Sequence, residues 1–431
     1  MKFFSYLAIL IFALSAYSQT ARVTSESSPV KPGGEFSQAR LVAFNKVWNT
    51  VNEKHYDATF GGIDWAKVRE IYLPKAEAAK SDEAFHSVLR QMLGELKLSH
   101  FGIFPPPPAA GNESANGSVG IDIIWLDGLA VINRVDKDSS ADAAGLKPGF
   151  VVSKIDDKSV LELLKPVHTS FAKRTLTEGV KKVYLERSVE ALIAGKSETP
   201  VKIEVLQAND APKTVELIRK PFTGEMSQPV GNFPKQEVVF ESRLLPGNIG
   251  YIRFNMWIVP QMPKIRAAVR EYAKANGIII DLRGNPGGLG GMAPGLAGLI
   301  SDKQMSLGSM ASRGGVTNLI AYPQSDPYLG KIVVLTDHGS ASTSELFAAG
   351  MQESGRGKIV GETTAGAVLP SVFEILPTGY TFQYAISDYK TPKSVLIEGK
   401  GVSPDMKVLQ TRRGLLDGRD AQLEAAINAL K

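Results

Sequence analysis

Apolar residues recur at helical spacing in the first regularly patterned part of the chain, which begins at Phe36. They stand three or four residues apart in two groups, Leu41, Phe44, Val47, Trp48 and Val51, and then Phe85, Val88, Leu89, Met92, Leu93 and Leu96. Such spacing places each group on one face of a helix, and Ser81 is positioned to cap the second helix. The pattern predicts a small helical domain over residues 36–104 that ends around Leu98-Ser99-His100.

The pattern changes after a run of four prolines, Pro105 to Pro108, which cannot continue a helix. Short strand-like runs such as Val201-Lys202-Ile203-Glu204-Val205 are then separated by turn residues, which is typical of a β-rich fold. A plain β-sandwich with glycine turns would also show this pattern. We expect a second domain over residues 105–225, with a loop insertion at 190–199.

Two glycine-containing segments of this second domain resemble those of a PDZ domain. Gly117-Ser118-Val119-Gly120-Ile121 opens it and residues 141–149, Ala-Asp-Ala-Ala-Gly-Leu-Lys-Pro-Gly, follow. A glycine-bracketed loop before a strand lets backbone N–H groups converge on a peptide carboxylate, while the strand edge pairs with the peptide. The resemblance therefore implies a peptide-binding site at Ser118, Val119, Gly120 and Ile121.

Strands and helices alternate in the last part of the chain, residues 240–431. Ile249 to Phe254, residues 278–280 and residues 332–335 are predicted strands, and Ile265 to Ala275 is a predicted helix closed by Gly277. This order indicates an α/β layer with a largely parallel sheet. Ligand chemistry in such sheets gathers where strands end and helices begin.

Two of these predicted strands end in motifs that suit acyl transfer. Residues 281–288 read Asp-Leu-Arg-Gly-Asn-Pro-Gly-Gly, and residues 339–345 read Gly-Ser-Ala-Ser-Thr-Ser-Glu and enter a helix. A serine between small residues at a strand-to-helix turn is held outward, and the next backbone N–H is placed to stabilise an oxyanion. Glycines allow a second N–H to approach the same point. Either motif alone is as well explained by a helix cap or a glycine turn.

The order of these segments resembles that of the C-terminal processing peptidases, the tail-specific serine proteases of peptidase family S41. The resemblance covers about residues 36–410 and implies an α+β multidomain fold whose α/β protease domain is of the ClpP/crotonase type. It implies Ser342 as nucleophile, with Ser340 and Ser344 as alternatives that serve the turn and the helix cap. Thr343 and one of Gly287 or Gly288 would donate to the oxyanion.

The residue at the position of the general base differs from that of the best-known family members, which place a lysine in the glycine-rich turn after the next strand. Here residues 361–367 read Gly-Glu-Thr-Thr-Ala-Gly-Ala, and an alanine stands where the lysine falls. Alanine takes no proton, so a serine–lysine dyad is excluded at that position. Lys358, inside the preceding strand, is expected to be a solvated surface charge.

A second branch, similar to the tricorn core protease, uses histidine instead. Its Ser-His pair matches Ser99-His100, and its glutamate matches Glu398, which precedes Gly401-Val402-Ser403-Pro404-Asp405. The segment from Tyr56-Asp57 to Asp64-Trp65 is also consistent with that branch. This resemblance implies a catalytic set of Ser342, His100, Ser99 and Glu398.

The chain has five histidines: His55, His86, His100, His168 and His338. His338 competes with His100 for the role of base because it precedes Ser342 by four residues, whereas the other three are expected to be ordinary surface or core residues. No pair of histidines and no carboxylate cluster has the spacing of metal ligands. We expect neither a metal nor another cofactor.

Composition narrows the class of protein further. Of 431 residues, 43% are hydrophobic and 22% charged, which excludes a disordered polymer and a polytopic membrane protein. The net charge of +5 is spread without a basic block, so nucleic acid is not an expected partner. The absence of cysteine excludes disulfides and thiol nucleophiles.

The first residues predict export. Lys2 precedes an apolar run from Tyr6 to Leu14 that is too short to span a membrane, and Ala16-Tyr17-Ser18 offers small residues to a signal peptidase. We expect a signal peptide over residues 1–18, cleavage before Gln19 and a flexible leader over 19–35. The mature protein would be periplasmic or secreted, with no stable membrane span; an uncleaved N-terminal anchor is the alternative.

These features together predict an exported serine endopeptidase. It would bind polypeptide substrates, through their C-terminal ends, with the PDZ-like domain, and cleave them by acyl-enzyme transfer. Two alternatives remain open at this point. One is a catalytically inactive peptide-binding or scaffolding protein that keeps the fold, and the other is an acyl hydrolase for non-peptide esters, which would leave the PDZ-like domain without a task.

Overall fold

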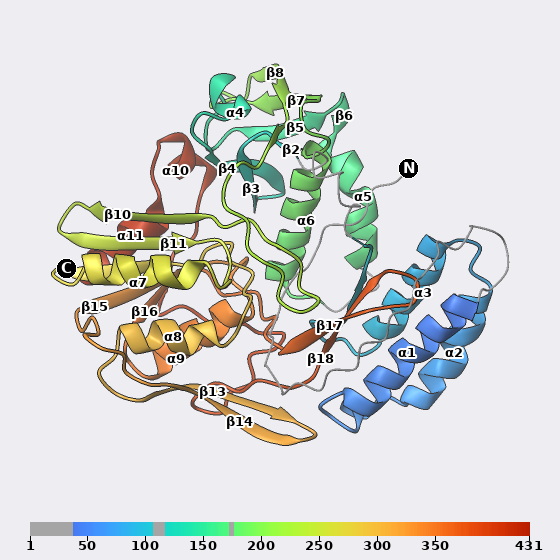
Figure 1. Ribbon diagram of the computed structural model, residues 1–431. Coiled ribbons are helices and arrows are strands. Elements are labelled where there is room, and N and C mark those ends of the chain that lie inside the picture. The colour runs from blue at the N-terminus through green and yellow to red at the C-terminus, as the bar shows by residue number, and fades with distance from the viewer. Residues whose placement is uncertain (1–37, 107–116, 172–175) are drawn as a thin grey trace.

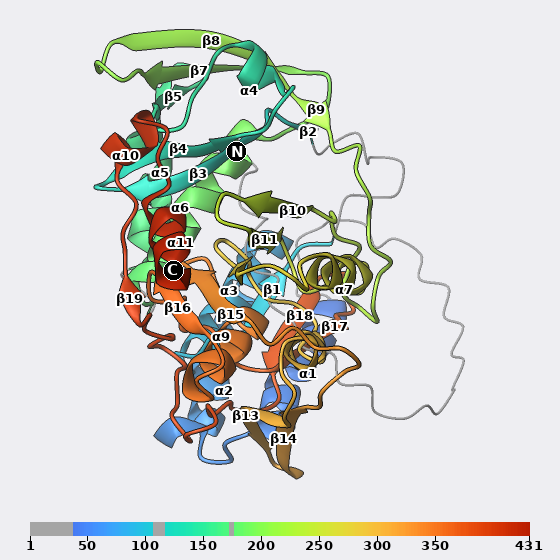
Figure 2. The same ribbon diagram turned by 90° about the vertical axis from the view of Figure 1, so that its left-hand side faces the viewer.

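The computed structural model describes residues 38–106, 117–171 and 176–431, which form three neighbouring regions (Figure 1). The expected signal peptide and leader, 1–18 and 19–35, lie outside the described residues. The sheet that carries β8 lies at one end of the molecule and the β13–β14 hairpin at the opposite end (Figure 2). The whole is a mixed α+β structure with several separate sheets.

Three helices form the N-terminal region: α1 (Gln38–Lys54), α2 (Trp65–Glu77) and α3 (Asp82–Gly94). The first and third follow the apolar periodicity, and Ser81 Oγ accepts the Ala84 N–H at 3.1 Å as the expected cap. Helix α2 has a weaker apolar stripe and begins at the cap residue Asp64. The buried faces of the helices pack together with Phe382 and Tyr384 from a distant part of the chain.

That distant part is a small antiparallel sheet that ties the helices to the C-terminal region. Its strands are β1 (Gly102–Phe104), β18 (Thr381–Ala385) and β17 (Ser371–Ile375), in that spatial order. Gly102 pairs with Gln383 directly after the Ser99-His100 pair. The pairing of β1 with β18 therefore holds the end of the helical region against the C-terminal region.

The middle region is a strongly twisted sheet of order β3-β4-β5-β7-β8 with two helices on it. Its elements are β2 (Gly117–Ser118), β3 (Ile121–Leu126), β4 (Leu129–Val135), α4 (Ser140–Ala143), β5 (Val151–Ile155), β6 (Lys158–Ser159), α5 (Val160–Phe171), α6 (Glu178–Ile193), β7 (Pro200–Leu206), β8 (Pro212–Ile218) and β9 (Lys220–Pro221). The strand expected around Val201 is β7. The segment expected to be a loop insertion begins inside α6, which ends at Ile193.

The C-terminal region is an α/β layer around a sheet of order β10-β11-β12-β15-β16-β19, antiparallel only between β10 and β11. Its strands are β10 (Phe240–Leu245), β11 (Ile249–Phe254), β12 (Gly277–Asp281), β13 (Met305–Ser312), β14 (Gly315–Ala321), β15 (Lys331–Thr336), β16 (Lys358–Gly361) and β19 (Met406–Lys407). Its helices are α7 (Gln261–Glu271), α8 (Met292–Leu299), α9 (Thr343–Glu353), α10 (Arg412–Leu416) and α11 (Ala421–Leu430). The largely parallel sheet is the one that the strand pattern predicts.

Alternate residues of the central strands bury opposite faces of this sheet. Ile278 and Ile280 point into the core under α7, α8 and α9, whereas Ile279 points toward α11. Strands covered on both faces are apolar throughout, which is why β12 reads as a continuous run. The layer holds the carboxyl ends of β12 and β15 side by side.

One expected boundary is wrong. The helix around Ile265 ends at Glu271 rather than Ala275, and Gly277 is the first residue of β12 rather than a helix cap. A Cβ on Gly277 would lie 2.7 Å from the Leu430 side chain. The glycine therefore allows the Leu430 side chain of α11 to pack closely on the start of the strand, and it does not terminate α7.

Candidate active site

The two motifs identified in the sequence meet at the carboxyl edge of the core sheet. β12 ends at Asp281 and its parallel neighbour β15 at Thr336. The loops that follow are joined by hydrogen bonds from Gly284 N–H to Asp337 Oδ1 (2.8 Å) and from Ala341 N–H to the Asn285 carbonyl (3.1 Å). The strand ends thus bring the glycine-rich loop against the serine-rich turn, as expected for a sheet of this kind.

Ser342 occupies the N-cap of α9 in a strained backbone conformation. Its φ is 53° and its ψ −117°, a region that residues other than glycine rarely adopt. Its N–H points to the Ala367 carbonyl at 2.9 Å and to Glu345 Oε2 at 3.0 Å. Strain of this kind persists where the surroundings hold it and is common at functional sites.

The three serines of the turn differ in what their hydroxyl groups do. Ser340 Oγ donates to the Leu282 carbonyl at 2.7 Å, and Ser344 Oγ donates to the Asn285 carbonyl at 3.0 Å while accepting from Trp257 Nε1. Ser342 Oγ is buried and has no hydrogen-bond partner among the described residues. Only Ser342 therefore presents an uncommitted hydroxyl group at the turn.

The buried Glu345 carboxylate organises the loops around Ser342. It accepts hydrogen bonds from Thr364 Oγ1 (2.6 Å) and from the backbone N–H groups of Gly366 (2.8 Å) and Ala367 (3.0 Å), besides that of Ser342. Burial raises its pKa to about 7, although these hydrogen bonds oppose the rise. Glu345 belongs to the serine-rich motif, and a serine followed three residues later by glutamate at a helix start is a pattern typical of such a cap.

Ser99, His100 and Glu398 form one hydrogen-bonded chain. Ser99 donates its N–H to Glu398 Oε1 (2.7 Å) and its hydroxyl to Oε2 (3.0 Å), and its Oγ lies 2.6 Å from His100 Nδ1. Because the single hydroxyl proton of Ser99 is given to the carboxylate, Nδ1 carries the proton in the other bond. His100 Nε2 is then an unprotonated acceptor, and it is buried with no partner among the described residues.

The loop at Ala367-Val368 joins this chain to Ser342. The Ala367 carbonyl accepts from Ser342 N–H, and the next N–H, that of Val368, donates to Glu398 Oε2 at 2.9 Å. His100 is also held with a positive φ of 60°. The structure thus gathers Ser342, His100, Ser99 and Glu398 around one loop, although they are far apart in the sequence.

Burial alone governs the protonation of His100. Its side chain lies out of water, which disfavours the imidazolium and lowers its pKa to about 3. Burial also raises the pKa of Glu398, against the hydrogen bonds from Val368 and Ser99. The ring is therefore neutral at ordinary pH, which is the state a proton acceptor requires.

His338, the competing histidine, has both ring nitrogens occupied. Nε2 lies 2.7 Å from Glu186 Oε1 and Nδ1 lies 3.2 Å from Glu362 Oε2. Burial would lower its pKa, but the hydrogen bonds and charges of the two glutamates outweigh burial and raise it to about 10. A protonated imidazole with no free nitrogen cannot accept a proton from a serine.

Two backbone N–H groups near Ser342 lack an acceptor. Gly287 N–H is used by Asn285 Oδ1 at 3.0 Å, but the N–H groups of Gly288 and Thr343 donate to no group in the part of the chain that the structure describes. Both glycines have positive φ, and a Cβ would lie 2.6 Å from the Ser342 Cβ at Gly287 and 2.2 Å from the Trp257 carbonyl oxygen at Gly288. Only glycine fits this close approach.

The glycine-rich turn over residues 361–367 has no cationic side chain. Its alanines, Ala365 and Ala367, are buried beside Ala341 and Val180. Lys358 lies at the start of β16 and is exposed, as expected from the sequence. Among the described residues no group of three or more histidine, aspartate or glutamate side chains has the geometry of a metal site.

The residues expected to bind peptide, Ser118 to Ile121, run from the last residue of β2 to the first residue of β3. Gly120 has a φ of 81°, and a Cβ there would lie 2.2 Å from Ser139 Cβ. Its N–H is taken by Ser118 Oγ at 3.0 Å, and the Val119 side chain is buried in the core of the middle region. Gly120 thus has a backbone conformation that favours glycine, and its N–H is already satisfied within the loop.

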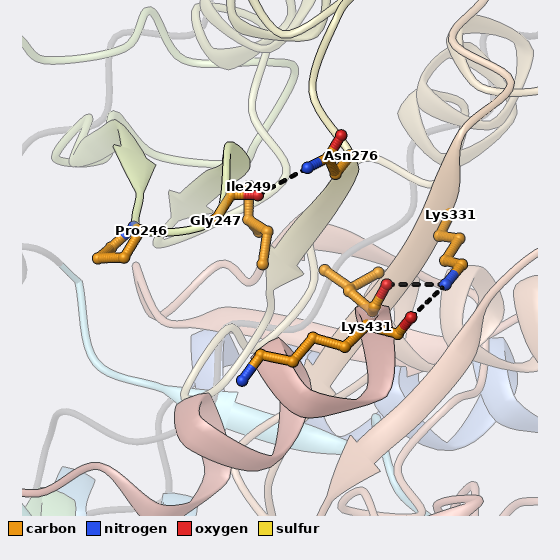
Figure 3. Close-up of a pocket in the computed structure, with 7 residues that line it drawn as sticks. Pro246, Gly247, Ile249, Asn276, Lys331 and Lys431 are labelled. Carbon is orange, nitrogen blue, oxygen red and sulfur yellow. Dashed lines mark hydrogen bonds between the residues drawn. The ribbon is translucent and has the colours of Figure 1, made fainter.

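A separate hollow of about 300 Å³ lies at the opposite, amino-terminal end of the core sheet. There Lys331 Nζ donates to the carbonyl groups of Leu430 and Lys431 at 2.8 and 3.1 Å (Figure 3). Its cation is thus engaged with the end of α11. Of the helices in the described ranges, none is long and apolar enough to cross a membrane.

The fold and site define a class of protein, the serine peptidases, and comparison with known proteins gives the family. Residues 248–408 match the model of peptidase family S41, and residues 36–94 match that of the tricorn protease C1 domain. The chain is a serine peptidase, and thus a hydrolase, whose C-terminal region matches family S41. The tricorn match covers the helices that lead to Ser99-His100.

Its similarity to individual proteins extends over most of the chain. It is 27% identical over 382 residues to the chloroplastic C-terminal processing peptidase of Tetradesmus obliquus, covering 85% of this chain and 76% of that protein. It is 28% identical over 409 residues to the carboxy-terminal processing protease CtpA of Bacillus subtilis, covering 93% and 76%. The solved photosystem II D1 C-terminal processing protease shares the fold with a TM-score of 0.58 and 24% identity, covering 91% of this chain and 97% of that one.

Proposed function

We propose that this serine peptidase is an exported endopeptidase in which Ser342 is the nucleophile and His100 the general base. One observation carries the proposal: Ser342 Oγ and His100 Nε2 are both buried without a hydrogen-bond partner among the described residues, and the Ala367-Val368 loop links the groups that hold them. Buried polar atoms normally have partners. A hydroxyl group and an imidazole nitrogen that both lack partners at the carboxyl edge of a parallel sheet are available to react with a substrate.

In this mechanism Ser342 Oγ attacks the scissile carbonyl carbon and transfers its proton to His100 Nε2. The tetrahedral oxyanion accepts hydrogen bonds from the free N–H groups of Thr343 and Gly288, a contribution of about 3 kcal/mol per donor in comparable hydrolases. The imidazolium then gives its proton to the leaving amine, and the C–N bond breaks. Water, deprotonated by the same nitrogen, attacks the acyl-enzyme ester and releases Ser342.

Ser99 and Glu398 position His100 and stabilise its charged form. The Ser99 hydroxyl oxygen accepts a hydrogen bond from His100 Nδ1–H and donates its own hydrogen to the Glu398 carboxylate. The imidazolium is therefore linked to a negative group through one hydroxyl group. The relay also selects the tautomer with Nε2 free. The match of the helices to a tricorn domain supports assignment to the histidine-using branch.

On the substrate side, we propose that the middle region acts as a PDZ-like domain for C-terminal ends of polypeptides. The glycine geometry at Gly120 and the position of β3 at the edge of its sheet support this role. The names of the similar proteins, which are C-terminal processing proteases, point the same way. A non-peptide ester substrate would leave this region without a function.

The proposed location is periplasmic or secreted, and it rests on the N-terminal segment. Lys2, the short apolar run and the small residues before Gln19 support cleavage by a signal peptidase. N-terminal sequencing of the protein recovered from outside the cytoplasm is expected to begin at Gln19. An intact Met1 in the membrane fraction would show instead that the segment is an anchor.

Fluorophosphonate labelling tests the nucleophile directly. We expect one covalent adduct, mapped by mass spectrometry to Ser342, and none in Ser342→Ala, which should remain folded because a small turn residue contributes little packing. Peptide hydrolysis should be lost in the same variant. An adduct on Ser340 or Ser344 would move the nucleophile, and no adduct at the pH of assay would favour a non-catalytic scaffold.

A further inference from the structure

Strand β3 is one of the two edge strands of the middle sheet, the other being β8. β3 pairs with β4 on one side only, and the backbone N–H groups of Ile123 and Trp125, two residues apart, face away from β4. Successive outward N–H groups on such an edge form a template for an added extended chain. In this structure both N–H groups already donate hydrogen bonds.

Two carboxylates of α6 occupy this edge. Glu186 Oε1 accepts the Trp125 N–H at 2.7 Å, and Glu190 Oε1 accepts the Ile123 N–H at 3.1 Å. Four residues along a helix rise about 6 Å, and two residues along a strand advance about 6.6 Å, so the two spacings match. The glutamates thus stand where the carbonyl oxygens of a pairing strand would stand.

The same helix reaches the catalytic turn. Glu186 Oε1 also binds His338 Nε2 at 2.7 Å, four residues before Ser342. At the start of α6, Thr177 Oγ1 donates to the Ala365 carbonyl at 3.0 Å, and a Cβ on Gly179 would lie 3.1 Å from the His338 Cβ. Helix α6 therefore contacts β3, which it accompanies in Figure 1, and also the loops around Ser342.

We propose that Glu186 and Glu190 close the outer edge of β3 in the resting protein, and that an extended substrate segment docks there only by displacing them. This proposal rests on the proposed function of the middle region and adds its regulation. When a peptide docks, one of its carbonyl oxygens replaces Glu186 as the acceptor of the Trp125 N–H. Glu186 is the residue that also binds His338. Occupation of the edge is therefore coupled to the catalytic turn through one carboxylate.

The occupant is extended main chain rather than a particular side chain. The groups offered are backbone N–H donors at strand spacing, and carbonyl oxygens of any extended polypeptide satisfy them. Hydrogen bonds to a charged carboxylate are stronger than those to a neutral carbonyl, so the resting edge favours the α6 side chains. Removing a carboxylate removes the competitor without altering the donors on β3.

Glu190 offers the clean test because it caps the edge without touching His338. In a Ser342→Ala background, which does not hydrolyse the probe, we would measure binding of a fluorescein-labelled unstructured peptide by anisotropy. Glu190→Ala is expected to lower the Kd about tenfold. Glu178→Ala is the matched control: Glu178 is exposed on the same helix and pairs only with Lys181, so its Kd should equal that of the background.

Glu190→Gln keeps the size of the side chain and removes the charge, so it replaces Glu190→Ala if the latter does not fold, with a smaller gain expected. Added peptide should also slow hydrogen exchange at the Ile123 and Trp125 amides. Equal Kd values for the Glu190 variants and Glu178→Ala, or no peptide binding by any variant, would overturn the proposal. Fluorophosphonate labelling of the parent protein is independent: a labelled Ser342 with unchanged Kd values rejects the closed edge and leaves the peptidase mechanism standing.

Discussion

Two buried histidines, His100 and His338, have surroundings that give them opposite properties. Within the part of the chain that the structure describes, His100 is linked to a carboxylate through Ser99 and its Nε2 has no partner, whereas His338 lies directly between Glu186 and Glu362. Burial lowers the pKa of His100 to about 3. The two glutamates overcome burial and raise the pKa of His338 to about 10.

The difference shows that sequence distance to the proposed nucleophile, Ser342, is a poor guide to the chemistry of a histidine. His338 is four residues from Ser342, but its two ring nitrogens bind a glutamate on α6 and a glutamate directly after β16. His100 is 242 residues away in the sequence, as 342 − 100 gives, yet its Nε2 is the uncommitted atom. What distinguishes a base from a structural ion pair is an unoccupied nitrogen and a neutral ring.

The largest expected effect separates the two histidines by rate. His100→Ala should lower kcat/KM about 10³-fold or more, because it removes both the proton acceptor and its relay. His338→Gln should lose little, since its ring takes no part in proton transfer. Steady-state hydrolysis of one unstructured peptide by the two purified variants measures both values. The reverse ranking would make His338 the base.

The next effect concerns pH and Glu398. Because burial lowers the pKa of His100 to about 3, kcat/KM should already be on its plateau at pH 5 and stay flat to pH 9. Glu398→Gln should lower that plateau by about 10²-fold, since the imidazolium formed in the transition state loses its charge partner.

Profiles from pH 3.5 to 9 for wild type and Glu398→Gln would decide this point. A limb near pH 6 to 7 that the substitution does not move would show a solvated histidine without help from Glu398. A plateau equal to that of wild type would reduce Glu398 to a residue that orders its own turn.

A smaller effect should appear in stability rather than rate. The pKa of His338 is higher in the folded protein than in the unfolded one, so its contribution is fully present below pH 6.5 and is lost as pH rises toward 10. His338→Gln should therefore lower Tm by roughly 5 °C at pH 6, and the difference should shrink by pH 9.5. Calorimetric scans at the two pH values test this; a difference that grows with pH would contradict a charged His338.

The smallest expected effect belongs to Lys358. It is exposed at the start of β16, and the turn that follows holds only alanines where the best-known family members hold a lysine. Lys358→Ala should leave kcat/KM within about twofold, as for most surface substitutions. A loss comparable to that of His100→Ala would restore a lysine mechanism.

Much of the site could be predicted because its motifs are local. The turn around Ser342 needs small residues in a fixed order at a strand-to-helix junction, and the glycine-rich loop needs two residues without Cβ, so both are visible in the sequence. The helices α1 and α3 were predicted for the same reason: an apolar stripe is a local property. The expectation that Gly277 closes a helix was wrong because Gly277 packs against Leu430, near the far end of the chain, and no local pattern shows that contact.

The amino-acid sequence by itself determined the order of the segments, the identity of the turn serine to test, the absence of a lysine in the glycine-rich turn and the presence of Ser99-His100 and Glu398. Only the tertiary structure decided which hydroxyl and which imidazole nitrogen stay unpaired, and that α6 lies on the edge of β3. The physical reason is that hydrogen-bond partnership and burial depend on groups from several strands and helices. Glu186 contacts residues on both sides of it in sequence, Trp125 and His338, and no local pattern encodes that meeting.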